Sequence, residues 1–307
     1  MAGYFPPDSI AVRVMSTRAV GLTYGKRALV IGAVHPRLFV GTVEHTSDKQ
    51  RPYNRLVITA RLFEAVFLGS KEEADRALEF TRRKHETVRG ELAEDAGPHY
   101  PAGTPYSALD PELMYMTMAF AFDSVEVMHD LLVRKLTATE RDDLYQDFVR
   151  WGELFGMPRS AAPADHAAFR ASFDGYLDSG RPYLTDYARL VGSYLAGVKR
   201  ADYAMPVPLR PLFGTLDLIV MGSLPAAVRR LYGFRWSPAH EAAYRAAVRG
   251  ARVMHLRPPR LAPRPLDPIL HGPNSDLFKV IAAAEKRNLR RGRLSMPEAM
   301  TEDALLR

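Results

Sequence analysis

The sequence has no cysteine among its 307 residues. Such a chain forms no disulfide, so a disulfide scaffold is excluded. Without a thiolate it also has no thiol nucleophile, Cys-ligated zinc, iron–sulfur cluster or thiolate-ligated haem. G-x-G-x-x-G, P-loop, G-x-S-x-G and H-E-x-x-H motifs are missing too, which removes the common signatures of nucleotide, serine-hydrolase and zinc-protease sites. A transition metal would therefore have to bind histidine, carboxylate, tyrosine or methionine side chains.

Long hydrophobic runs are also absent. The longest uncharged apolar run is Leu113–Phe122, ten residues, whereas a membrane-spanning helix needs about 20. The apolar stretch from residue 211 to 228 is interrupted by Asp217 and Pro225. Residues 1–7 lack the basic region and apolar core of a signal peptide. We therefore expect no transmembrane segment, at most a weak peripheral contact with a membrane, and a cytoplasmic location.

Positive charge is concentrated in the C-terminal part. The chain has a net charge of +7, but residues 227–293 carry 15 Lys and Arg against four acids, and residues 1–226 sum to −2. A basic stretch can bind nucleic acid or an anionic membrane, although it is more often a solvated surface. No recognition-helix motif is present, and several prolines interrupt residues 258–265. We expect no nucleic-acid partner; DNA binding that weakens steeply with salt would be needed to revive that hypothesis.

Helical periodicity and helix-start signals recur along the chain, and no β-hairpin signal is found. The start signals include a cap at Asp8 or Ser9, capping boxes at Ser70 with Glu73 and Thr137 with Glu140, and a cap at Asp110 before Pro111. The composition, 47% hydrophobic and 25% charged, is that of a globular protein. We predict an all-α domain of about ten helices over residues 1–284, followed by a loose basic C-terminal tail, residues 285–307. The expected helices cover residues 9–20, 24–34, 52–67, 70–92, 110–136, 137–156, 164–179, 182–196, 209–221, 225–232, 238–254 and 278–290.

Among nine histidines, His85 stands out by its surroundings. A di-iron bundle would need repeated Glu-x-x-His motifs, and this chain has one, at residues 126–129. On a helix over residues 70–92, His85 shares its face with Thr81, Val88 and Arg89. Such a face suits a haem, with imidazole on iron, apolar cover, and a guanidinium on a propionate. The spacing alone favours the other interpretation, a surface histidine among charged residues.

Several short motifs follow one another along the chain: His35-Pro36, Arg55-Leu-Val-Ile-Thr59, Phe67-Leu-Gly69, His85-x-x-Val88-Arg89-Gly90, Gly97-x-x-Tyr100-x-Ala102, Asp110-Pro111-x-Leu113, Leu224-Pro225-x-x-x-Arg229 and Gly233-x-x-Trp236. Each motif alone is weak. Their ordered occurrence over residues 10–255 resembles the MpaB-like family of the latex-clearing rubber oxygenases and the side-chain oxygenase of mycophenolic acid biosynthesis.

The resemblance implies an all-helical fold around one haem b, with iron as the metal and oxygenase activity on a hydrophobic, isoprenoid-like small molecule. It implies that His85 ligates the iron and that Arg89 holds a propionate. Val88 and Thr81 would contact the haem beside them. Arg55 and Thr59 match an arginine and a threonine of the family and would be the catalytic residues on the opposite haem face, where O₂ binds.

The sequence departs from the family pattern at other positions. Ile58 stands where the rubber oxygenases have a lysine that can occupy the distal iron site. Glu44 is the nearest candidate for the family's acidic residue. Tyr115-Met-Thr117 replaces a Trp-Val-His stretch, so no histidine is present there. Cleavage of an isoprenoid double bond is therefore not implied, and O₂-dependent hydroxylation or peroxide-dependent oxidation stays open. Ile58 also favours the alternative, a non-catalytic haem-binding sensor or carrier.

The methionine- and aromatic-rich run at residues 114–122 has two interpretations. It could line a pocket for an apolar substrate, but a stripe of this kind more often belongs to a protein core. The sequence identifies neither the substrate, nor the electron donor, nor the oligomeric state.

Overall fold

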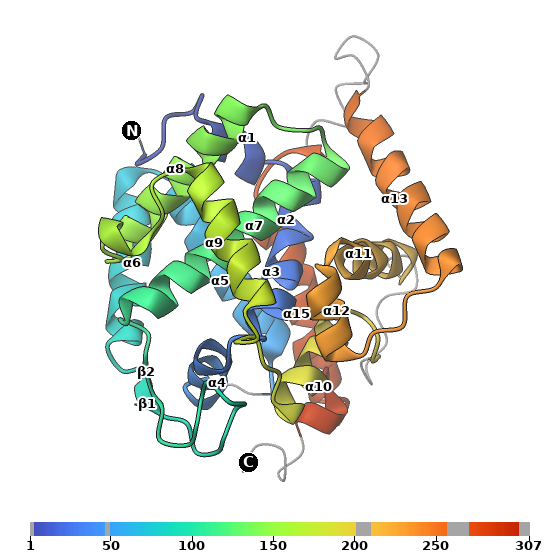
Figure 1. Ribbon diagram of the computed structural model, residues 1–307. Coiled ribbons are helices and arrows are strands. Elements are labelled where there is room, and N and C mark those ends of the chain that lie inside the picture. Colours follow the sequence, from blue (N-terminus) through green and yellow to red (C-terminus); the bar gives the residue numbers. More distant parts are fainter. Residues whose placement is uncertain (1–2, 47–49, 201–209, 257–269, 301–307) are drawn as a thin grey trace.

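The computed structural model describes residues 3–46, 50–200, 210–256 and 270–300 and consists mainly of α-helices (Figure 1). Within these residues the one sheet has two antiparallel strands. The predicted all-α fold is confirmed. Helix α7 (Pro111–Leu132) crosses the middle of the molecule and contacts α3, α8, α2 and α13.

Four short helices lie at the start of the described chain: α1 (Ile10–Met15), α2 (Arg18–Gly21), α3 (Tyr24–Gly32) and α4 (Pro36–Glu44). Of the two candidate caps, Asp8 and Ser9, the Ser9 hydroxyl caps α1 by accepting the Val12 N–H. The single helix expected to residue 20 is wrong, because the chain breaks after α1 and Thr17 pairs with His271 in an isolated bridge. Helix α4 was not predicted, although Pro36 at its first position is a recognised start signal.

Helices α5 (Pro52–Leu68) and α6 (Lys71–His85) form a hairpin joined by Gly69 and Ser70. The predicted capping box is present. The Ser70 hydroxyl accepts the Glu73 N–H, and the Glu73 carboxylate accepts the Ser70 N–H. Gly69 leaves no room for a side chain, because a Cβ there would lie 2.6 Å from the Ala65 carbonyl oxygen. The same Cβ would lie 3.0 Å from a carboxylate oxygen of Glu73, so this turn has room only for glycine.

Helix α6 ends at His85, seven residues before the predicted end, and the chain then enters strand β1 (Arg89–Glu91). Strand β1 pairs with β2 (Pro105–Ser107), so the expectation of no hairpin is wrong. Two β-branched residues and a glycine follow the helix at 87–90, and all three types have low helix propensity. Three cationic residues, Arg82, Arg83 and Lys84, occupy the last turn of α6, where they complement the helix dipole.

The predicted starts of the next helices are confirmed. Asp110 caps α7, and Thr137 with Glu140 forms a capping box for α8 (Ala138–Leu154). Helices α9 (His166–Asp178) and α10 (Asp186–Leu195) follow. The methionine- and aromatic-rich run lies in α7 and belongs mainly to the core. Its buried members are Tyr115, Met116, Met118, Phe120 and Phe122.

A buried ionic network connects α3, α7 and α9. Asp123 of α7 accepts hydrogen bonds from Arg27 and Arg170, each with an N–O distance of 2.5 Å. Arg27 and Asp123 are each only 2% exposed. Although burial opposes ionisation, the two guanidinium groups lower the pKa of Asp123. The carboxylate is therefore charged and paired, the condition under which a buried ion pair is tolerated.

The C-terminal half contains α11 (Arg210–Ser223), α12 (Ala226–Tyr232), α13 (Pro238–Leu256) and α15 (Ser275–Leu289). Two 3₁₀ turns complete the described elements, Arg159–Ala161 and Pro297–Ala299. Residue 285, the predicted start of a tail, lies inside α15, and Met296, Ala299 and Met300 are buried. The packed structure thus continues to residue 300, and the remaining tail residues, 301–307, lie outside the described part.

Among the described residues no single helix has the length and hydropathy to span a bilayer. One pair passes the same criteria only when taken together, Pro211–Ser223 with Ala226–Tyr232, and it is bent by 110° at the break.

Candidate haem site

The hairpin of α5 and α6 is closed at its turn and accessible at its other end. Near the turn, Val66 of α5 and Ala74 of α6 are both 0% exposed. Farther from the turn, Ile58 of α5 is 44% exposed although it is apolar. Residues equally distant from residues 69–70 lie at about the same height in such a hairpin, so Ile58 is level with Thr81. The accessible end of the hairpin is therefore bordered by α5 residues 55–59 and α6 residues 80–85.

His85 is the last residue of α6 and lies at this accessible end. Helical spacing places it on the same face as Thr81, Ala77 and Ala74, and the two alanines are buried. The imidazole is half-buried, and burial lowers its pKa. Neither ring nitrogen has a hydrogen-bond partner among the described residues. The side chain is thus a neutral imidazole with a free nitrogen, the form that ligates a metal.

The structure changes the predicted relation between His85 and Arg89. They are not one helical turn apart, because residues 85–88 form a turn in which the Val88 N–H donates to the His85 carbonyl oxygen at 3.1 Å. Arg89 begins β1, is exposed, and makes no ion pair with any described residue. Both residues still border the same end of the hairpin, since only this tight turn separates them.

Val88 and Thr81 lie on either side of His85 in the sequence. Val88 is half-buried and faces α4, because a Cβ added at Gly41 would lie 3.7 Å from Val88 Cγ1. Thr81 is half-buried, and its hydroxyl donates to the Ala77 carbonyl oxygen at 2.9 Å. The Thr81 hydroxyl is therefore already hydrogen-bonded within α6, and the Thr81 methyl group is the part that can contact a ligand.

Arg55 and Thr59 lie one turn apart on α5 and are both accessible. The Arg55 guanidinium donates to the Thr42 carbonyl oxygen at 2.9 Å and to the Thr46 hydroxyl. It thus binds the C-terminal end of α4. Burial lowers the pKa of Arg55 even though its side chain is exposed to solvent.

Glu44, the candidate for the family's acidic residue, ends α4. Its carboxylate accepts a short hydrogen bond from the Tyr106 hydroxyl. His45 Nε2 lies 3.4 Å from the oxygen of that hydroxyl. Tyr106 belongs to β2 and lies over Gly90 of β1, where a Cβ would be 2.6 Å from the hydroxyl oxygen. These polar groups therefore flank the strand that follows His85. The sequence carried no signal for Tyr106, because its partner is 62 residues away.

Comparison with known families decides the classification. The family described as ER-bound oxygenase mpaB/B'/Rubber oxygenase, catalytic domain, matches residues 12–253. The chain belongs to this oxygenase family. It is therefore an oxygenase enzyme, as the ordered motifs predicted. Neither a curated protein nor a solved structure matches the chain.

The side chains at the open end of the hairpin have the chemistry that a haem requires. Haem is held by a side chain that ligates its iron, by apolar contact with its rings, and by cations near its propionates. His85 supplies a neutral imidazole without a competing hydrogen bond. Ile58 offers exposed apolar surface, and Arg89 is a cation without an ion-pair partner in the described chain. No group of three or more His, Asp or Glu side chains in the described residues could hold a metal ion directly.

The other buried histidines are less suited to this role. His35 is 0% exposed and lies between the rings of Tyr100 and Tyr176, with centroid distances of 5.6 and 5.8 Å. Burial lowers the pKa of His35 to about 4. His129 is 5% exposed, and burial lowers its pKa to about 4 as well. The Glu126 carboxylate accepts a hydrogen bond from His166 Nε2 at 2.8 Å. Closed surroundings or an existing partner thus separate these rings from a large ligand.

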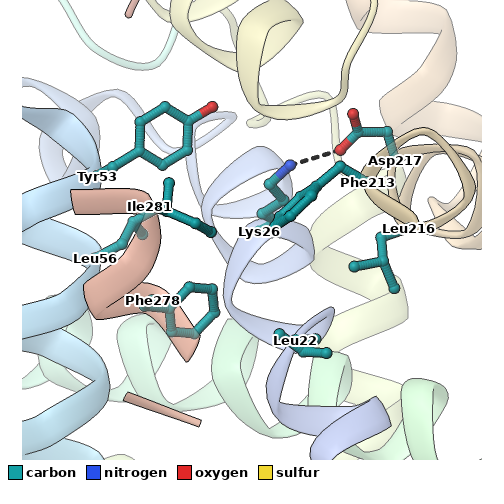
Figure 2. A pocket seen from close by; sticks show the side chains of 9 residues that line it. All are labelled: Leu22, Lys26, Tyr53, Leu56, Phe213, Leu216, Asp217, Phe278 and Ile281. Atoms are coloured by element: carbon teal, nitrogen blue, oxygen red, sulfur yellow. Dashed lines mark hydrogen bonds and ion pairs between the residues drawn. The ribbon is translucent and has the colours of Figure 1, made fainter. Parts of the chain in front are cut away.

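A small cavity of about 60 Å³ lies on the other side of α5 (Figure 2). Its walls come from α3, α5, α11 and α15, and an ion pair of 2.5 Å between Lys26 and Asp217 borders it. Tyr53 and Asp217 raise the pKa of Lys26, against the effect of burial. Pockets for drug-sized ligands measure about 300–1,000 Å³, so this cavity is too small for a haem or an extended substrate. The residues that line it are Leu22, Lys26, Tyr53, Leu56, Phe213, Leu216, Asp217, Phe278 and Ile281.

Proposed function

We propose that this oxygenase is haem b-dependent and acts on a hydrophobic small molecule. The observation that carries the proposal is His85, a neutral imidazole with free ring nitrogens at the accessible end of the α5–α6 hairpin. Membership in the rubber oxygenase family supports the oxygenase chemistry, and the exposed side chain of Ile58 supports an apolar ligand beside it.

In this proposal His85 would hold the iron, and Arg89 would neutralise a propionate. The methyl groups of Val88 and Thr81 pack beside the imidazole. Bound haem supplies the activation of dioxygen. Arg55 and Thr59 provide hydrogen-bond donors on the α5 side, and Arg55 is oriented by its two bonds to the end of α4.

Ile58 excludes an iron ligand from this position of α5. An isoleucine side chain has no atom that ligates iron, so no protein group from position 58 competes with an incoming ligand. It also contributes an apolar surface beside Arg55 and Thr59, which favours a hydrocarbon substrate over a polar one. The reaction class of such a site is oxidation of an apolar molecule by dioxygen.

The test is haem binding by the full chain produced with an adequate haem supply. We expect a Soret band with histidine-type ligation, lost in His85→Ala while the helical circular dichroism is retained. The matched control is His99→Ala, because His99 is exposed on a loop. An unchanged Soret band in His85→Ala would disprove this ligand assignment.

Catalysis is measured separately from haem binding. We expect an apolar isoprenoid substrate to increase dioxygen consumption by the haem-loaded protein. A stable Soret band without substrate-dependent consumption over a panel of such substrates would instead identify a haem-binding sensor or carrier.

A further inference from the structure

Helices α5 and α15 pack side by side in opposite directions (Figure 1). Each helix supplies a glutamate to the N-terminal end of the other. This arrangement joins α5, which carries Arg55 and Thr59, to a helix that lies beyond residue 253, where the family match ends.

The first turn of α5 depends on Glu285 of α15. Arg51, the N-cap residue, makes no side-chain cap bond, and Pro52 at the first position has no N–H. The next two amides, of Tyr53 and Asn54, donate to the Glu285 carboxylate at 3.3 and 3.0 Å. The Ser295 hydroxyl donates to the same carboxylate at 2.6 Å. Glu285 is 1% exposed, so solvent does not replace these bonds.

The other end of the pair uses the same chemistry. Glu64 of α5 accepts the backbone N–H groups of Asn274 and Ser275, the second at 2.9 Å, where α15 also has no side-chain cap. The segment before α15 is fixed to α2, because the Arg18 guanidinium donates to the Pro273 carbonyl oxygen at 2.8 Å. Helix α15 is thus held firmly and can act as a reference for α5.

Glu285 acts close to the proposed haem. The amides that it accepts belong to the two residues immediately before Arg55, in the same turn of α5. Glu64 lies more than two turns farther along the helix, toward its closed end. Loss of either glutamate removes a comparable pair of hydrogen bonds, but only Glu285 controls the turn from which the Arg55 side chain extends.

We propose that Glu285 is a positioning residue for Arg55, which makes α15 part of the oxygenase site although it lies outside the matched family region. The effect of Glu285 on catalysis rests on the proposed haem function. Its effect on the first turn of α5 rests on the hydrogen bonds described above. Glu285 touches neither haem nor substrate and acts through the first turn of α5.

The experiment compares Glu285→Gln with Glu64→Gln as a matched pair, because each change removes one carboxylate that caps a helix. Amide hydrogen exchange of the haem-free full chain gives the first readout. We expect the amides of residues 53–55 to exchange at least about tenfold faster in Glu285→Gln than in Glu64→Gln, since capped amides lose a charge-assisted bond. Equal exchange in the two variants would overturn the inference.

Cyanide binding to the ferric haem protein gives the second readout. We expect the association rate to change about threefold or more in Glu285→Gln and in Arg55→Lys, with no further change when the two are combined. Glu64→Gln should bind cyanide at the wild-type rate. Additive effects of Arg55→Lys and Glu285→Gln would overturn the coupling. A wild-type chain that takes up no haem would refute the proposed function instead, and the exchange data would still decide whether Glu285 fixes the turn.

Discussion

Polar side chains are paired in the middle of α7, but those of His85 and Arg89, at the open end of the α5–α6 hairpin, are unpaired in the described chain. In α7, Asp123 is buried and receives a guanidinium on each carboxylate oxygen. At the hairpin, His85 has free ring nitrogens and Arg89 has no ion-pair partner among the described residues. Polar groups that are fully paired hold a core together, whereas unpaired groups beside exposed apolar surface have binding capacity left for a ligand. Three changes test this contrast.

The largest effect is expected at Asp123. Asp123→Asn leaves Arg27 buried without a counter-charge, and loss of one partner of a buried pair costs about 3–5 kcal/mol. We expect urea denaturation to show this decrease in the free energy of unfolding. Asp174→Asn is the control, because Asp174 pairs with Arg170 at a surface where the carboxylate is 59% exposed, and the cost there should be below about 1 kcal/mol.

Equal stability of these two variants would contradict the contrast. Should Asp123→Asn fail to fold, the double change Arg27→Met with Asp123→Leu replaces both buried charges by apolar groups. That variant should recover much of the lost stability, because two apolar side chains of similar size need no pairing.

Acid should destabilise the protein through its buried histidines. The pKa of His35 is lowered to about 4 in the folded chain by burial, with Arg37 and Arg181 adding to the effect and Glu112 opposing it. An unfolded histidine titrates near 6.5, so stability is complete above that pH and falls as the pH drops from about 6.5 to 4. The loss amounts to about 3 kcal/mol for this group. Unfolding free energies measured across this pH range provide the test.

His35→Phe should reduce that pH dependence, since the ring between Tyr100 and Tyr176 no longer gains a proton. The pH profile of His99→Ala, a change at an exposed ring, should match that of the wild type. An unaltered profile in His35→Phe would show that another group is responsible.

The smallest effect is expected at the hairpin. Arg89→Ala should accelerate haem loss, because a hydrogen bond to a charged group contributes about 1–3 kcal/mol, and the absorption spectrum should stay the same. Transfer of haem to an excess of apomyoglobin measures the rate. Arg76→Ala is a suitable control, because Arg76 is an exposed arginine of α6 near the closed turn of the hairpin. Identical transfer rates for the two variants would remove Arg89 from the haem contact.

The sequence predicted helix starts better than helix ends. Capping boxes at Ser70 and Thr137 are local patterns of four residues, and both helices begin where these patterns place them. The end of α6 was misplaced because an apolar helical spacing continues past His85, and strand pairing with residues 105–107 outweighed it. His85 could be found from its motif, whereas its relation to Arg89 depended on that helix end.

Other features of the site had no local signal. Arg55 donates a hydrogen bond to Thr42 of α4, a helix that the sequence pattern did not predict. Glu44 accepts a hydrogen bond from Tyr106, which is distant in the sequence and is brought near by the tertiary fold. The glutamates that cap α5 and α15 are more than 200 residues from the amides that they bind. Pairings over such distances are set by tertiary packing, so spacing in one sequence does not reveal them.

The cap on α5 also sets an order of events during synthesis. Residues 53 and 54 leave the ribosome long before residue 285, so the first turn of α5 gains its carboxylate partner only after more than 200 further residues have been made. Contacts between such distant segments form late, because the intervening chain must close first. The α5–α6 hairpin thus receives its last capping group from α15. A polypeptide that ended at residue 253 would contain every proposed haem contact. It would still lack Glu285, the residue that caps the first turn of α5.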